Sequence, residues 1–255
     1  MTAVGDVRRE RRAARPRSRA TFASMLGEIL LTAGVVILLY VLWQVWIGDV
    51  IYSSQHNAQG AKQSHEWSLI EPTELAPAPE PSEGAYEPLV LPEPVDTEVF
   101  ALMRVPRWGD DYAVNIAGGT SRAGTLDHIG IGHYLDTEMP GEVGNFGLAA
   151  HRTTFGKPFS DLQSLRIGDP IVIETKEGWY TYRFRTLEYV SPDAYDVLAD
   201  VPQAPEVPAG ERYITLTSCS PRFAMTERIV AYGVFESYLP RSTGETPPAL
   251  TEELL

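Results

Sequence analysis

The sequence predicts an all-β domain, either a barrel or a sandwich, that follows an N-terminal membrane-spanning helix. Two observations support this prediction. From residue 99 to residue 239, short runs of β-branched and aromatic residues are separated by Gly, Pro and Asp turns, which is typical of all-β folds rather than of βαβ units. Before them, residues 29–47 contain no charged side chain and are long enough to cross a bilayer as a helix.

Six segments are expected to form the strands of the domain. They are residues 99–106, 112–118, 146–152, 169–190, 212–219 and 228–237. The sequence Lys-Glu-Gly at residues 176–178 indicates a hairpin loop within the fourth segment. Short helices are expected within residues 121–134, 160–165 and 191–199, with Ser160 as the N-cap of the second.

The N-terminal segment has a charge asymmetry that orients the predicted span. Seven arginines lie among residues 1–20, against two acidic residues. Arginine excess marks the cytoplasmic side of a span, and Trp43 and Trp46 lie where interfacial aromatics are expected on the other side. We therefore predict a cytoplasmic basic tail at residues 1–28 and an uncleaved signal anchor at 29–47. A cleaved signal peptide fits the sequence less well, because no A-x-A site follows the apolar stretch closely. A buried core helix also fits less well, because the periodicity of an amphipathic helix is missing.

The part of the chain beyond the predicted span is strongly acidic. Residues 48–255 hold 14 basic and 31 acidic residues, a net charge of −17. This charge disfavours binding to nucleic acid or anionic lipid, accommodates an amine-bearing partner, and is explained equally well by solubility alone. His133 has Asp136 and Glu138 nearby, but one histidine and two carboxylates without regular spacing are weak evidence for a metal site.

A stretch rich in proline and glutamate separates the predicted span from the strands. Residues 71–96 contain seven prolines and six glutamates, which favours an extended, semi-rigid spacer. Residues 48–70 show no clear period and are expected to form a juxtamembrane stalk. The predicted organisation is therefore an extracellular stalk and linker at residues 48–97, a folded domain at 98–240 and a C-terminal tail at 241–255.

Cys219 is the only cysteine of the chain. It cannot form an internal disulfide or a Cys-rich metal site, so it is either a small buried hydrophobe or a reactive thiol. A reactive thiol needs a cationic or basic neighbour that favours the thiolate. Of the five histidines, His56 and His65 lie in the predicted stalk, whereas His151 ends a predicted strand, where loops usually carry functional sites.

Each of these residues also has a purely structural explanation. Taken alone, Cys219 on an apolar run is more often a packed core residue than a nucleophile. His151 alone is more often a hydrogen-bonded structural histidine. Arg228, at the start of the last predicted strand, would usually be a surface charge, so only the combination of the three residues favours catalysis.

Three separated motifs resemble the sortases, the membrane-anchored cysteine transpeptidases of Gram-positive bacteria. They are AAHRTTFGKPF at residues 149–159, TLTSC at 215–219 and TERIVAYG at 226–233. The resemblance covers residues 98–240, a normal domain length. It implies a closed β-barrel of about eight strands with a few short helices.

The resemblance also implies roles for individual residues. Cys219 is the expected nucleophile, His151 its histidine partner and Arg228 the arginine that completes the site. Thr217 and Ser218 are expected to contact the substrate. The family signature usually has threonine where this chain has Ser218, and because serine keeps the hydroxyl we expect tuning of the site rather than loss of activity. No metal and no organic cofactor are expected.

Within the family, residues 132–159 resemble class E, the actinobacterial housekeeping type. Class C members usually carry an Asp-Pro-aromatic lid motif and often a second span, and neither is found in this sequence. The implied activity is cleavage of a C-terminal sorting signal, LAxTG in preference to LPxTG, between Thr and Gly through a thioacyl enzyme. The implied partners are surface proteins bearing this signal and an amine of peptidoglycan, and the implied location is the outer face of the cell membrane.

Two alternatives belong to other classes. An L,D-transpeptidase also uses a cysteine on a β scaffold, but its signature has histidine and glycine immediately before the cysteine, where this chain has Thr217 and Ser218. A non-enzymatic, membrane-tethered β-barrel binding module would have an inert Cys219, which would not react with a thiol reagent in the native state.

Overall fold

The computed structural model describes residues 21–43, 48–81 and 85–254, and the chain divides into two compact units at residues 44 and 45. The first unit contains helix α1 (Phe22–Leu42), which is long and apolar enough to cross a membrane. The helix includes much of the predicted span at residues 29–47. Trp46 and the basic residues 1–20 lie outside the described residues.

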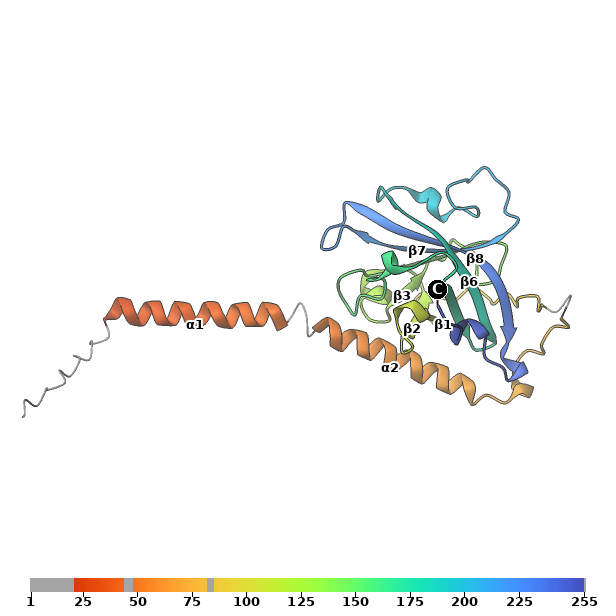
Figure 1. Cartoon of the computed structure of the whole chain (residues 1–255), viewed down its shortest axis with the longest axis horizontal. Helices are drawn as coiled ribbons and strands as arrows, with labels where there is room; N and C mark the ends of the chain where they lie inside the picture. Colours follow the sequence, from red (N-terminus) through yellow and green to blue (C-terminus); the bar gives the residue numbers. More distant parts are fainter. Residues whose placement is uncertain (1–20, 44–47, 82–84, 255) are drawn as a thin grey trace, which may run out of the picture. The chain divides into compact units, whose positions relative to one another are not determined.

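The second unit contains eight strands that close into a barrel (Figure 1). In chain order they are β1 (Val99–Arg104), β2 (Val114–Gly118), β3 (Ile131–His133), β4 (Gly144–Ala150), β5 (Pro170–Thr175), β6 (Gly178–Val190), β7 (Arg212–Ser220) and β8 (Glu227–Pro240). The order around the barrel is β1-β2-β3-β4-β7-β8-β6-β5, and β5 pairs with β1 to close it. The predicted all-β barrel is confirmed.

Alternation along the strands builds the barrel interior. In β7, Ile214 and Leu216 lie in the hydrophobic core, whereas Thr215 and Thr217, which alternate with them, are on the opposite face of the strand. In β8, Val230 packs outside the barrel against Val197 of η6 (Tyr195–Leu198). The outer face of β7 and β8 is therefore partly covered by the segment that joins β6 to β7.

The predicted short helices exist as single turns. They are η4 (Arg122–Leu126), η5 (Leu162–Ser164) and η6. Ser160 is not an N-cap: η5 is preceded by Asp161, whose side chain makes no capping bond, and the Ser160 hydroxyl donates instead to the Asp161 carboxylate at 2.9 Å. Further turns of this kind are η2 (Pro72–Glu74), η3 (Pro106–Trp108), η7 (Arg241–Thr243) and η8 (Pro248–Leu250).

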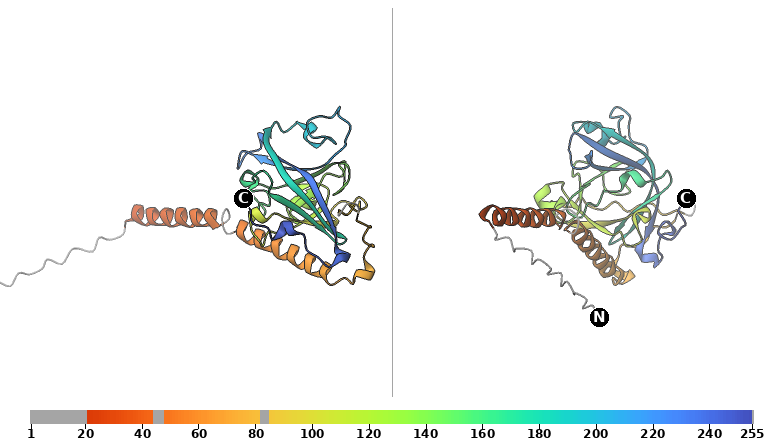
Figure 2. Two further views of the ribbon diagram at one scale, coloured as in Figure 1. Left: turned by 45° about the vertical axis from the view of Figure 1, so that its right-hand side comes forward. Right: turned by 60° about the vertical axis from the view of Figure 1, so that its left-hand side comes forward.

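Residues 48–68, for which the sequence indicated no secondary structure, form helix α2 (Gly48–Ser68) and pack against the barrel (Figures 1 and 2). The buried face of α2 consists of His56, Gly60 and Trp67. A Cβ at Gly60 would lie 2.1 Å from the carbonyl oxygen of Ala113, so only glycine permits this approach. The helix was not predicted because its buried side chains are mostly not apolar.

The segment between α2 and β1 and the segment after β8 also contact the barrel. Tyr86 and Leu89, within the proline-rich stretch, pack against the core, and the Tyr180 hydroxyl donates to the Leu89 carbonyl. These side chains hold the described part of the linker on the barrel surface. After β8, Ala249 packs with Val172 and Trp179, so residues of the predicted C-terminal tail complete a small second cluster.

Candidate active site

The three predicted catalytic residues line one cavity of about 530 Å³. Cys219 lies near the end of β7 and is paired in register with Arg228 of β8. His151 directly follows β4, which is the other neighbour of β7. Cys219 and Arg228 follow His151 by 68 and 77 positions along the chain, and the strands bring all three residues to one end of the β4-β7-β8 sheet.

Cys219 is partly exposed, as a thiol that reacts with an external substrate must be. The backbone that carries it is fixed from the side of β4. Arg152, a buried arginine, donates from Nη1 to the Cys219 carbonyl oxygen at 3.3 Å and from Nη2 to Gln163 at 3.2 Å. The residue after His151 therefore anchors the strand end that carries the sulfur.

His151 is held between a carboxylate and an aromatic ring. Its Nε2 lies 2.6 Å from Oδ1 of Asp127, and its ring stacks on Phe155 with centroids 5.2 Å apart. Because an ionised carboxylate only accepts hydrogen bonds, Nε2 carries the proton in this arrangement, and Nδ1 is left for proton exchange with other groups. Asp127, which follows η4, was not anticipated from the sequence.

Arg228 donates hydrogen bonds to the backbone carbonyls of Met225 and Glu227, at 3.4 and 3.0 Å. Across residues 21–43, 48–81 and 85–254, no carboxylate oxygen lies within 4.0 Å of its guanidinium nitrogens. The positive charge at this wall of the cavity is therefore available to stabilise a negative charge that develops on a bound molecule.

Thr217 and Ser218 line the same cavity and tie β7 to β4. The Thr217 hydroxyl donates to the Leu148 carbonyl at 3.1 Å and lies 3.0 Å from the Tyr134 hydroxyl. The Ser218 hydroxyl donates to the Ala150 carbonyl at 2.7 Å. Both side chains are buried, and the hydroxyl that serine shares with threonine is the group used here.

His133 does not share the surroundings of the other candidates. It is fully buried and its ring contacts those of Phe100 and Phe146. Burial lowers the pKa of its imidazole, and a hydrogen bond with the Gly147 carbonyl opposes this effect but is weaker. Glu138 accepts a hydrogen bond from the Asn145 amide at 2.9 Å. In the described part of the chain, no group of three His, Cys, Asp or Glu side chains is arranged to hold a metal ion.

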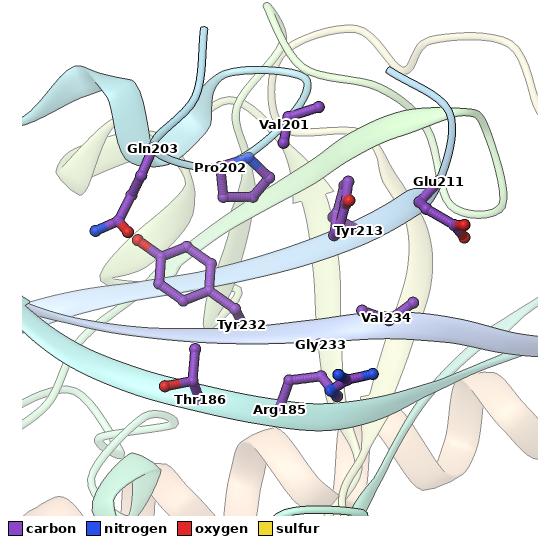
Figure 3. Close-up of a pocket in the computed structure, with 10 residues that line it drawn as sticks. All are labelled: Arg185, Thr186, Val201, Pro202, Gln203, Glu211, Tyr213, Tyr232, Gly233 and Val234. Carbon is purple, nitrogen blue, oxygen red and sulfur yellow. The ribbon is translucent and has the colours of Figure 1, made fainter. Parts of the chain in front are cut away.

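A second cavity, of about 520 Å³, lies on the outer surface of β6, β7 and β8 (Figure 3). Its walls include Tyr213 of β7, Tyr232 of β8 and Gln203 of the segment that joins β6 to β7, and Figure 3 shows the Tyr232 hydroxyl pointing toward Gln203. The described residues that line this cavity include no cysteine or histidine. Thiol chemistry therefore belongs to the cavity that contains Cys219.

Known proteins resemble this chain over most of its length. A family model described as the sortase domain matches residues 103–236. Sortase SrtE1 of Streptomyces coelicolor is 36% identical over 96% of this chain, which spans 66% of the length of that relative. Sortase SrtE2 of the same organism is 30% identical over 91% of this chain and 89% of its own length.

Solved structures give the same result for the barrel. Sortase E1 from Streptomyces coelicolor, solved with a tripeptide in its active site, is 39% identical, covers 60% of this chain and 97% of its own, and has a TM-score of 0.55. The SrtA sortase from Actinomyces oris is 31% identical, covers 66% of this chain and 95% of its own, and has a TM-score of 0.61. The chain described here therefore belongs to the sortase family of cysteine transpeptidases and is similar to its class E members.

Proposed function

We propose that this protein is a membrane-anchored sortase that cleaves a C-terminal sorting signal of the LAxTG or LPxTG type between Thr and Gly. It then joins the new carboxyl end of the surface protein to an amine of peptidoglycan. The observation that carries this proposal is the presence of Cys219, His151 and Arg228 around one cavity. Three residue types with complementary roles in acyl transfer are thus within reach of one bound peptide.

Acylation begins with attack of the Cys219 thiolate on the carbonyl carbon of the threonine. The C–S bond forms, the C–N bond to glycine breaks, and the glycine amine leaves with a proton supplied by the His151 imidazolium. Asp127 accepts the hydrogen bond from Nε2 of the imidazole and so fixes the orientation of the ring. The guanidinium of Arg228 stabilises the negative charge that develops on the carbonyl oxygen of the threonine during this attack.

Deacylation reverses these roles with a different amine. The amine of a peptidoglycan stem peptide or cross-bridge attacks the thioacyl carbon, the C–S bond breaks, and neutral His151 accepts the proton that the amine loses. The products are a new amide and the regenerated thiolate beside an imidazolium. None of these steps uses a metal ion or an organic cofactor.

The cavity and the termini also fit the proposed substrate and location. Thr217 and Ser218 line the cavity together with Cys219, and the exposed side chains of Phe223 and Met225 offer apolar surface to a signal that begins with leucine. The arginine-rich residues 1–20 support a cytoplasmic N-terminus and an extracellular catalytic domain. The net charge of residues 48–255 accommodates an amine-bearing partner and disfavours nucleic acid.

The test uses the full chain in detergent micelles with quenched fluorescent LAxTG and LPxTG peptides and an amine acceptor. Cleavage at Thr-Gly is expected for the wild type, with a loss of about 1,000-fold or more for Cys219→Ala and His151→Ala and of about 100-fold for Arg228→Ala. The exposed residues His65 and Arg185 supply matched controls, since His65→Ala and Arg185→Ala should cleave normally.

Two results would overturn the proposal. If neither peptide were cleaved and Cys219 reacted with iodoacetamide only after denaturation, a binding module with an inert thiol would be the better explanation. If Cys219→Ala still cleaved, the nucleophile would lie elsewhere. The ratio of LAxTG to LPxTG cleavage decides between the two signal types.

A further inference from the structure

The loop that carries His151 is packed against helix α2 as well as against the barrel. Phe155 lies between the two: its ring stacks on His151 on one side, with centroids 5.2 Å apart, and meets the ring of Tyr52 edge-on, with centroids 5.9 Å apart and an interplanar angle of 67°. A continuous line of three rings therefore runs from α2 to the proposed general acid.

The backbone of the loop also touches the first turns of α2. A Cβ added to Gly156 would lie 2.9 Å from the backbone nitrogen of Ser53 and 2.9 Å from Nδ1 of His56. At the start of α2, burial raises the pKa of Asp49, while the charge of Lys157 and a hydrogen bond with the Gly156 backbone oppose that rise. The helix thus meets the loop through direct backbone contact and through charge.

The conformation of this loop is one that the chain does not adopt unaided. Phe155, Gly156 and Lys157 have successive φ angles of +51°, +74° and +44°. A non-glycine residue in the left-handed region costs on the order of 1 kcal/mol or more, and such conformations persist only where surrounding structure determines them. Part of that surrounding structure is the N-terminal half of α2.

The C-terminal half of α2 is fixed to the barrel independently. Ser64 donates to the buried carboxylate of Glu174 at 2.7 Å, and Trp67 packs against Leu102 and Ala113. Together with the close approach at Gly60, these contacts make α2 a rigid support for the loop.

We propose that α2 positions the proposed general acid, with Tyr52 holding Phe155 and Phe155 holding the imidazole plane of His151. This inference rests on the proposed function, because it concerns the orientation of His151 during acyl transfer. Tyr52 is a positioning residue that acts through Phe155 and does not touch the substrate. Along the chain, α2 begins at Gly48, six positions after Leu42, the last residue of the helix that can cross a membrane.

The test compares three variants of the full chain in detergent micelles. Tyr52→Ala should lower kcat about tenfold and change KM less than about twofold, because misplacing a reacting group by a fraction of an ångström slows the chemical step rather than binding. Tyr52→Phe keeps the aromatic ring and should have the same kcat as the wild type. Ile51→Ala truncates the neighbouring exposed side chain of α2 and should leave both constants unchanged. Thermal unfolding of each variant is recorded to show that the barrel is intact.

The outcomes separate this inference from the proposed function. If Tyr52→Ala is folded and its kcat equals that of the wild type, or if Ile51→Ala loses as much as Tyr52→Ala, then α2 does not position His151. An equal loss in Tyr52→Phe would also contradict the inference, because the ring would not be the group that matters. Failure of the wild type to cleave either peptide would instead overturn the proposed function, and the inference with it.

Discussion

Asp127 lies at hydrogen-bonding distance from His151, with 2.6 Å between its Oδ1 and Nε2 of the imidazole. In Asp127→Asn the side chain keeps its shape but loses its negative charge and one of its two acceptor oxygens. We expect kcat to fall by about tenfold or more, because the hydrogen bond that holds the ring in one orientation is weakened. Steady-state kinetics with the fluorescent peptide measure this change.

Asp136 provides the control for that experiment, since it is an exposed aspartate in the turn after β3. Asp136→Asn should retain wild-type kcat. If Asp127→Asn also did so, the carboxylate would be a structural partner of His151 and would have no role in proton transfer.

At the residue scale, Cys219 stands out as the only cysteine of the chain, whereas His151 and Arg228 were predicted as site residues from the resemblance of their motifs to those of the sortases. The sequence did not point to Asp127 or Arg152. Asp127 is one of 34 acidic residues and Arg152 is one of 21 basic residues, and neither belongs to a distinguishing pattern along the chain. Only the closing of the barrel places Asp127, 24 positions before His151, against its ring.

At the scale of elements, the six predicted segments overlap every strand of the barrel except β3. β6 and β7 carry long runs of β-branched and aromatic residues, whereas β3 has three residues, follows Gly130 and contains Gly132. It lies within residues 121–134, where a short helix was expected. Helix α2 was missed for a related reason: its buried face presents a histidine, a glycine and a tryptophan, so hydrophobic periodicity gives little signal there.

The buried histidine of α2 makes the docking of that helix sensitive to pH. Burial lowers the pKa of His56 below its usual 6.5, with a further lowering by the charge of His151 and an opposing hydrogen bond with the His128 backbone. The unfolded chain therefore binds a proton at a higher pH than the folded chain does. The stability due to neutral His56 is complete above about pH 6.5 and is lost as the pH falls below it.

Guanidinium unfolding of the full chain at about pH 7.5 and about pH 5.5 tests this expectation. The wild type should have the lower midpoint at the acidic pH, and His56→Gln should show a smaller decrease. His65→Gln, an exposed site on the same helix, should decrease as much as the wild type does. His133, which is also buried with a lowered pKa, accounts for a decrease that remains in the His56 variant. An unchanged decrease in His56→Gln would show that this imidazole titrates alike in both states.

At the scale of the whole molecule, one buried carboxylate joins segments from both ends of the second unit. Glu174 of β5 accepts hydrogen bonds from Ser64 of α2 at 2.7 Å, Arg104 of β1 at 2.8 Å and Arg241 after β8 at 2.9 Å. Glu174→Gln leaves two arginines without their counter-ion. We expect the free energy of unfolding to fall by about 3–5 kcal/mol, as when one member of a buried ion pair is removed.

Chemical denaturation of the full chain provides the measurement. Glu236 pairs with Arg183 at 2.8 Å but is 42% exposed, so Glu236→Gln should cost between about 0 and 1 kcal/mol. Equal losses in the two variants would mean that the Glu174 cluster contributes no more than a surface pair.

The closed barrel has a consequence for how any peptide is recognised. From Tyr213 to Thr217, strand β7 is paired with β4 on one side and with β8 on the other, so this part of the sheet has no edge to which an added strand could bind. A peptide cannot be read there by extending the sheet, as it is in proteins that recognise an extended ligand through main-chain ladders. Discrimination must come from side chains and loop backbones around the cavity, which can diverge between relatives while the barrel beneath them stays the same.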